Sequence, residues 1–110
     1  MSQVTTHVLD TSSGRPASDV PVILFSGPDW KEKSKGKTNQ DGRINDLIEK
    51  DKLLPPGIYK LRFETKDYFN KNNLPVFYPF IEIVFEITGS DHYHVPLLLS
   101  PFGYSTYRGS

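Results

Sequence analysis

The chain has 110 residues, 36% of them hydrophobic and 13% aromatic, which predicts one globular domain spanning residues 1–110. Its 13 basic residues balance its 13 acidic residues, and this zero net charge argues against a nucleic-acid partner, because phosphate binding needs a basic excess or patch. The absence of cysteine excludes disulfides, thiol chemistry and classical zinc fingers.

Membrane and export signals are also missing from the sequence. The opening residues, MSQVTTHVLD, lack both the basic stretch and the apolar stretch of a signal peptide. No apolar run approaches the length of a membrane-spanning helix, which is about 20 residues. We therefore expect a soluble, cytoplasmic protein with no membrane partner.

Short β-strands separated by turns are predicted for the first half of the chain. The segment 3–10 (QVTTHVLD) alternates, so that one face carries Val4, Thr6 and Val8 and the other carries Thr5, His7 and Leu9. After a turn at 12–19, the segment 20–27 (VPVILFSG) predicts a second strand. Lysines at every second position of 31–37 predict a strand with a solvated face, and Asp41-Gly42 predicts a β-hairpin turn.

The second half continues this pattern around one short helix. A Pro-Pro-Gly turn leads into a predicted strand at 58–65, and 66–74 (KDYFNKNNL) is the only stretch that predicts a helix. The segment 80–87 alternates strongly and places on one face Ile81, Ile83, Phe85 and Ile87. The segment 92–100 predicts a further strand, and 101–110 a turn and a last strand. Seven or eight strands at this spacing indicate an antiparallel β-sandwich.

The predicted strand at 92–100 (HYHVPLLLS) has an unusual outer face. Alternation assigns to the core Tyr93, Val95, Leu97 and Leu99. The residues that then face outward are His92, His94, Pro96 and Leu98. An outward face that carries leucine beside histidine is a candidate interface or cleft.

The three histidines are the first candidates for chemistry. Each one alone is compatible with an ordinary surface or hydrogen-bonded strand histidine. His92 and His94 share a strand face at a spacing that suits zinc or copper, but His7 is distant in sequence, so we expect no metal site. No P-loop, dinucleotide fingerprint or Gly-x-Ser-x-Gly motif occurs. These residues indicate a sandwich with candidate site histidines, and they do not identify a reaction.

Three segments are similar to a known family. They are 6–17 (THVLDTSSGRPA), 41–44 (DGRI) and 92–110 (HYHVPLLLSPFGYSTYRGS), and they resemble the 5-hydroxyisourate hydrolases, the transthyretin-related enzymes of urate breakdown. The resemblance covers the whole chain, and the terminal YRGS is its most specific element because it separates these enzymes from transthyretin. It implies an all-β, transthyretin-like antiparallel β-sandwich of two four-stranded sheets with one short helix. It also implies a homotetramer, a dimer of dimers with its sites in the channel between dimers.

The resemblance further implies a set of site residues. The catalytic residues would be His7, Arg43 and His94, and the substrate-binding residues would be Tyr107, Arg108 and Ser110. The substrate would be the small molecule 5-hydroxyisourate, hydrolysed to 2-oxo-4-hydroxy-4-carboxy-5-ureidoimidazoline.

The chemistry of these residue types suits that reaction. A histidine, with a pKa of about 6.5, can serve as general base for water, and either His7 or His94 could take that role. Arg43 can stabilise the negative charge that develops on the attacked carbonyl oxygen. No cofactor is needed, because nothing is oxidised and the substrate carries its own electrophile.

Two other classes of protein fit parts of the same sequence. One is a non-catalytic carrier of a small apolar ligand, as transthyretin is, and the other is a structural sandwich module with no ligand. The two histidines, Arg43 and the terminal YRGS favour the enzyme. Tyr107 and Arg108 are also bulky and polar where a carrier would need a small, apolar lining.

Overall fold

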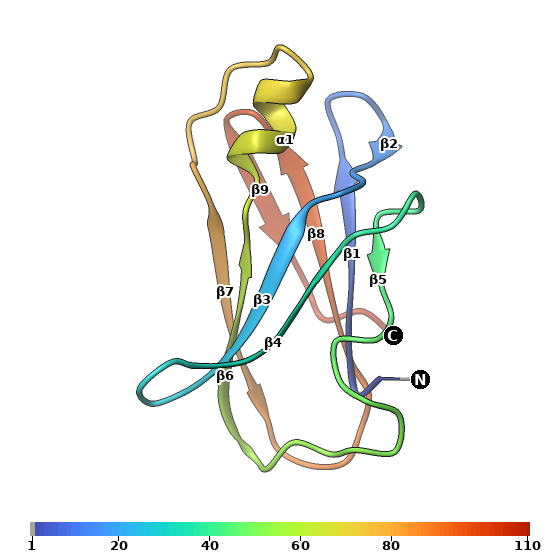
Figure 1. Cartoon of the computed structure of the whole chain (residues 1–110), viewed down its shortest axis with the longest axis vertical. Helices are drawn as coiled ribbons and strands as arrows, with labels where there is room; N and C mark the ends of the chain where they lie inside the picture. Colours follow the sequence, from blue (N-terminus) through green and yellow to red (C-terminus); the bar gives the residue numbers. More distant parts are fainter. Residues whose placement is uncertain (1) are drawn as a thin grey trace.

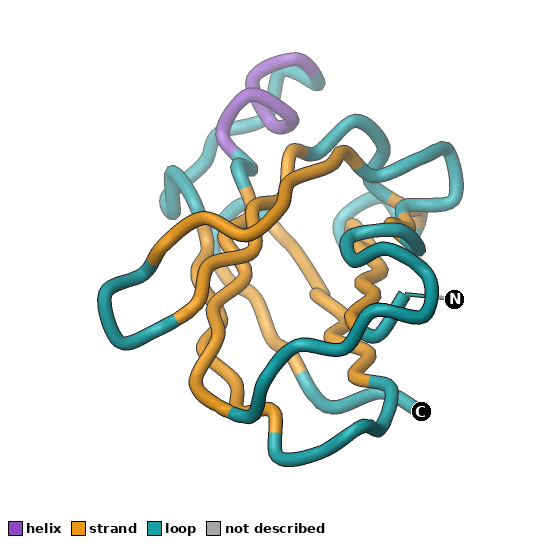
Figure 2. Tube along the Cα trace, turned by 60° about the horizontal axis from the view of Figure 1, so that its bottom comes forward, coloured by secondary structure: helices purple, strands orange, loops and turns teal. Residues whose placement is uncertain are grey.

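Two β-sheets stacked face to face form the molecule, which a computed structural model describes over residues 2–110 (Figures 1 and 2). The first sheet has the strand order β2-β1-β8-β9, with short β5 also paired to β1, and the second has the order β4-β3-β6-β7. The elements are β1 (Val4–Asp10), β2 (Arg15–Pro16), β3 (Pro21–Ser26), β4 (Lys31–Lys37), β5 (Arg43–Ile44), β6 (Gly57–Phe63), α1 (Lys66–Lys71), β7 (Ile81–Ile87), β8 (Tyr93–Ser100) and β9 (Gly103–Thr106). The predicted sandwich of two sheets with one short helix is therefore confirmed, and short β5 adds a fifth strand to the four of the first sheet.

The core lies between the sheets and is built by the alternation that the sequence predicts. From the first sheet it takes Val4, Val8, Tyr93, Val95, Leu97 and Leu99, and from the second Val22, Leu24, Tyr59, Leu61, Phe63, Ile81, Ile83 and Ile87. His7, Leu9, His94 and Leu98 are half-buried on the outer face of the first sheet. Both predicted faces of β1 and β8 are thus confirmed, which matters because the histidines share the outer one.

The direction of one strand pair differs from the prediction of a wholly antiparallel sandwich. β1 and β8 pair in parallel, with Thr5 opposite His94 and His7 opposite Pro96. The other strand pairs in the described chain are antiparallel. The entire second sheet lies between β1 and β8 in sequence, so no tight hairpin constrains their relative direction.

The Asp41-Gly42 turn also differs from the prediction of a β-hairpin. The strand before it, β4, belongs to the second sheet, whereas β5 after it pairs with β1 of the first sheet. The turn therefore carries the chain from one sheet to the other. The predicted turn at 12–19 likewise contains β2, which pairs with the end of β1.

The predicted helix is confirmed as α1, which packs at one end of the sandwich (Figures 1 and 2). Its Phe69 is fully buried, and its Tyr68 hydroxyl donates a hydrogen bond to Asp10 Oδ2 at 2.7 Å, so the helix is tied to β1. No helix among residues 2–110 is long and apolar enough to cross a membrane.

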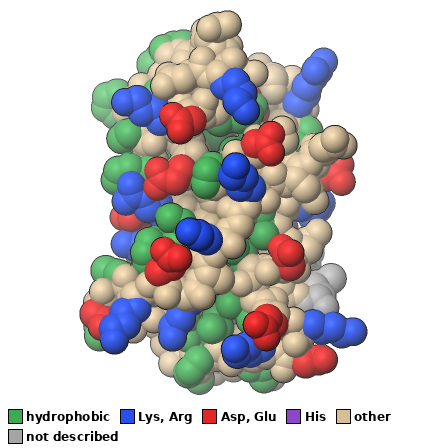
Figure 3. Space-filling model, viewed as in Figure 1, with side chains coloured by type: hydrophobic (Ala, Val, Ile, Leu, Met, Phe, Trp, Pro, Cys, Tyr) green, Lys and Arg blue, Asp and Glu red, His purple; other side chains and the backbone are tan. Residues whose placement is uncertain are grey.

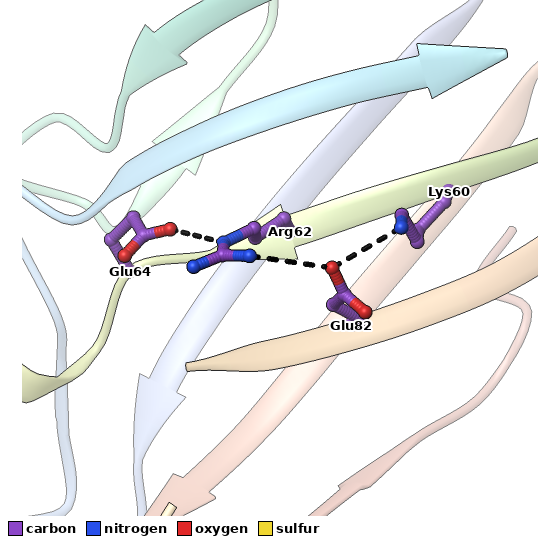
Figure 4. Close-up of polar contacts among 4 residues, drawn as sticks. All are labelled: Lys60, Arg62, Glu64 and Glu82. Carbon is purple, nitrogen blue, oxygen red and sulfur yellow. Dashed lines mark hydrogen bonds and ion pairs between the residues drawn. The ribbon is translucent and has the colours of Figure 1, made fainter. Parts of the chain in front are cut away.

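The outer face of the second sheet carries a cluster of paired charges (Figure 4). Glu82 on β7 forms ion pairs with Lys60 at 3.2 Å and with Arg62 at 3.6 Å. Arg62 also forms an ion pair with Glu64. Because Arg62 and Glu82 are directly opposite in the β6–β7 register, the pair favours that register by about 0.2–1 kcal/mol. Basic and acidic side chains are interspersed over the side of the molecule seen in Figure 3, and histidine is not among the side chains visible there.

Candidate active site

His7 and Arg43 are brought together by the short strand β5. The two residues are partners in the β1–β5 register, so their side chains leave the first sheet on the same outer face. The Gly42 carbonyl accepts a hydrogen bond of 2.7 Å from the Val8 backbone, which docks the turn onto β1. Gly42 has φ +73°, and a Cβ there would lie 2.5 Å from the Val8 carbonyl oxygen, so only glycine allows this approach. The turn therefore sets the position of Arg43 beside His7.

His94 reaches the same face from β8, on the other side of β1. It lies opposite Thr5 in the parallel register, two residues along β1 from His7. The chain end runs beside it, because the Gly109 backbone donates a 2.8 Å hydrogen bond to the His94 carbonyl. A Cβ on Gly109 would lie 2.5 Å from His94 Cδ2, so the backbone of the tail is packed directly against the imidazole ring.

One hydroxyl group lies between two of the histidines. Thr5 Oγ1 is 2.8 Å from Nδ1 of His94 and 2.8 Å from Nε2 of His92, and the Thr5 residue is only 2% exposed. The two imidazole rings are stacked with centroids 6.2 Å apart. Within the described residues, Nε2 of His94 has no hydrogen-bond partner. His94 thus presents one free nitrogen and has the other held by Thr5.

Burial and nearby positive charge favour the neutral forms of His7 and His94. Burial lowers the pKa of His7 below its ordinary 6.5, and the positive charge of Arg43 lowers it further. The pKa of His94 is lowered mainly by burial, then by Arg43, and then by His92 and His7. Arg43 thus lowers the pKa of both rings, in agreement with the strand register, which places the three residues on neighbouring strands of the first sheet. At neutral pH both imidazoles are available as proton acceptors.

Two of the three tail residues that the resemblance implies line a cavity of about 350 Å³ at the edge of the sandwich. Tyr107 and Arg108 line it together with His94, and the opposite wall comes from β7. The Arg108 guanidinium lies over the Tyr93 ring at 4.5 Å, and Tyr107 is 59% exposed. Ser110 is exposed, and its side chain makes no hydrogen bond to the described part of the chain. The cavity includes His94 but neither His7 nor Arg43.

Thr5 and Gly109 are the neighbours of the cluster that were not predicted as site residues. Alternation did place Thr5 on the face of His7, but the parallel pairing that brings it to His94 leaves no local signal in the sequence. Within residues 2–110, no three potential metal ligands of the types His, Cys, Asp and Glu come together.

Comparisons of the sequence and of the structure with known proteins point to the same family. Residues 4–109 match the HIUase/Transthyretin family. The 5-hydroxyisourate hydrolase of Mus musculus is 46% identical, over 99% of this chain and 96% of its own length. Among solved structures, the 5-hydroxyisourate hydrolase of Klebsiella pneumoniae aligns with a TM-score of 0.87 at 37% identity, covering 97% of this chain and 98% of that one. Sea bream transthyretin in complex with thyroxine aligns with a TM-score of 0.89 at 32% identity, covering 97% and 94%.

Proposed function

The chain belongs to the HIUase/transthyretin family, and we propose that it hydrolyses 5-hydroxyisourate in urate degradation, with His7, Arg43 and His94 as its catalytic residues. The observation that carries this proposal is the cluster of two imidazoles and one guanidinium on the outer face of the first sheet. Both imidazoles have a lowered pKa, caused by burial and by Arg43, which favours the neutral form that can accept a proton.

The proposed reaction opens the six-membered ring of the substrate at an amide bond. One neutral imidazole accepts a proton from water as the oxygen attacks the carbonyl carbon, and a C–O bond forms. Arg43 stabilises the negative charge on the carbonyl oxygen with fixed N–H donors. When the C–N bond breaks, the imidazolium formed in the first step passes its proton to the ring nitrogen, and the second histidine orients the reacting groups. One water is consumed, and no electrons are transferred.

Tyr107, Arg108 and Ser110 are proposed to contact the substrate from the tail. Tyr107 and Arg108 support this by lining a cavity with His94, and Ser110 follows Gly109, which is packed against the His94 ring. The bulk and polarity of Tyr107 and Arg108 suit a flat substrate with several carbonyl groups better than an apolar hormone.

The competing function is that of a carrier, which sea bream transthyretin represents among the similar structures. The two functions are separated by one assay, the ultraviolet absorbance of freshly generated 5-hydroxyisourate with and without the protein. A hydrolase accelerates its disappearance, whereas a carrier leaves the spontaneous decay rate unchanged and the proposal fails.

The contact between the tail and His94 leads to a prediction about Gly109. Replacing Gly109 with alanine will lower the rate of 5-hydroxyisourate hydrolysis by about tenfold or more, because the new Cβ displaces the imidazole ring and small misplacements of catalytic groups are costly. The matched control is Gly89→Ala, since a Cβ at Gly89 meets nothing within 4 Å. Equal rates for the two variants would show that the tail does not position His94.

We further propose that four copies assemble as a dimer of dimers and complete the site. The two sheets end in β7 and β9, whose outer edges lack a partner strand within the described chain. Near these edges lie exposed apolar side chains, including Val84 at 57%, Phe102 at 68% and Tyr104 at 44% exposure. Unpaired edges that carry apolar groups favour pairing with another copy. A neighbouring copy would also cover the face that carries His7 and Arg43.

Sedimentation tests this assembly. At micromolar concentration we expect a species with four times the mass of the chain, and on dilution the activity should fall in step with dissociation. A monomer that retains full activity would contradict the proposal that the site needs a second copy.

A further inference from the structure

The contacts of Thr5 restrict where the protons of His92 and His94 can be. A threonine hydroxyl has one hydrogen to donate and two lone pairs that accept. Its oxygen lies at hydrogen-bond distance from one nitrogen of each ring, both at 2.8 Å. At most one of these nitrogens can accept the hydroxyl hydrogen, so the other must carry its own proton and donate it to Thr5. The tautomers of the two histidines are therefore linked.

The proposed reaction decides in which direction this chain of hydrogen bonds runs. A base must present an unprotonated nitrogen, and the nitrogen of His94 that is free to do so is Nε2. Neutral His94 then carries its proton on Nδ1 and donates it to the Thr5 oxygen. The Thr5 hydroxyl in turn donates to Nε2 of His92, which leaves the exposed His92 with its proton on Nδ1.

We propose that Thr5 is a positioning residue for the hydrolysis: its hydroxyl, supported by His92, holds His94 in the tautomer that leaves Nε2 free to accept a proton from water. This inference rests on the proposed function. Thr5 suits the role because it is 2% exposed and lies on a central strand opposite His94 in the register, so neither its backbone nor its side chain is free to move away.

The bond from His94 to Thr5 also strengthens during the reaction. Once Nε2 has taken the proton, His94 is an imidazolium, and its Nδ1–H donates a charge-assisted hydrogen bond to the hydroxyl. Because this gain occurs only as the charge develops, losing it should lower kcat and leave KM nearly unchanged.

The chain offers a matched pair of variants for the test. Thr5→Val keeps the shape and the strand preference of the side chain but removes the hydroxyl, and we expect kcat to fall by about tenfold. Thr5→Ser restores the hydroxyl and should return kcat to within about threefold of the original protein. The control is Thr6→Val, which removes a hydroxyl bonded to the Val95 carbonyl at 2.6 Å on the opposite face of the same strand. Thr6→Val should lower the melting temperature and leave kcat unchanged.

His92 supplies a second arm of the kinetic test. If His92 acts through Thr5, then His92→Ala and Thr5→Val should each lower kcat by about tenfold, and the double variant by little more than either one. Multiplicative effects in the double variant, or an unchanged kcat in Thr5→Val, would overturn the proposal.

Nitrogen NMR of ¹⁵N-histidine-labelled protein tests the tautomer without any turnover. We expect neutral His94 to carry its proton on Nδ1 in the original protein and in Thr5→Ser, and to lose this preference in Thr5→Val. A proton on Nε2 of His94 in the original protein would overturn the inference even if the enzyme is active. If the protein does not hydrolyse 5-hydroxyisourate, the proposed function fails and the catalytic role of Thr5 fails with it. The NMR result still decides whether Thr5 sets the tautomer.

Discussion

Replacing His94 with alanine will lower kcat for 5-hydroxyisourate by about 100-fold or more, and His7→Ala will have an effect of similar size. Both rings lie on the outer face of the first sheet, and both have a pKa that burial and Arg43 lower. Each variant thus removes one of the two groups proposed to move protons in the reaction. Because neither residue belongs to the buried apolar core, the melting temperature should change little. Stopped-flow absorbance and a thermal melt measure the two quantities.

His92→Ala is the control for this pair. His92 is more exposed than His94, and among the described residues it is linked to the cluster by the contact with Thr5 and by stacking on the His94 ring. Its replacement should therefore lower kcat by about tenfold, less than the replacement of either histidine proposed to be catalytic. If His92→Ala is the most damaging of the three, the assignment of His94 rather than His92 as the catalytic residue is wrong.

Strand alternation was the part of the fold and of the candidate site that could be read from the sequence. It put Val4 and Val8 on one face of the first strand and His7 on the other, and it assigned Tyr93 to the core and His94 to the outer face. This prediction is reliable because side chains of a strand alternate between faces with a fixed period of two, whatever the strand pairs with. Alternation gave His92 and His94 the same face, so the choice between them came from the family resemblance alone.

Pairing partners could not be predicted in the same way. The Asp41-Gly42 turn has the residues of a hairpin, yet it connects two sheets, because Gly42 can approach the Val8 carbonyl more closely than any other residue could. The parallel register that places Thr5 beside His94 joins residues at opposite ends of the sequence. Both features depend on contacts between distant segments, which leave no periodic signal in either one. The contacts that place Arg43 and Thr5 in the cluster are of this kind.

Replacing Arg43 with glutamine will lower kcat/KM by about 100- to 1000-fold, the range for loss of a group that stabilises an oxyanion. It will also move the pH profile. The guanidinium charge lowers the pKa of both His7 and His94, so its removal raises both, and the rate will begin to fall at a higher pH than in the original protein as the solution is acidified. The other titratable neighbours, His92 and His7 beside His94 and Asp41 near His7, remain in place.

Arg43→Lys separates the two roles of the side chain. Lysine keeps the positive charge, so the histidine pKa values and the acid side of the profile should stay near those of the original protein. It lacks the planar, bidentate donors, so kcat/KM should still fall. Arg15→Gln, which replaces an exposed arginine on β2 of the same sheet, should change neither quantity.

A rate loss in Arg43→Gln without an upward shift of the acid limb would mean that Arg43 only binds or supports the site. An upward shift without a rate loss would mean that its charge tunes the histidines and that another group must stabilise the oxyanion.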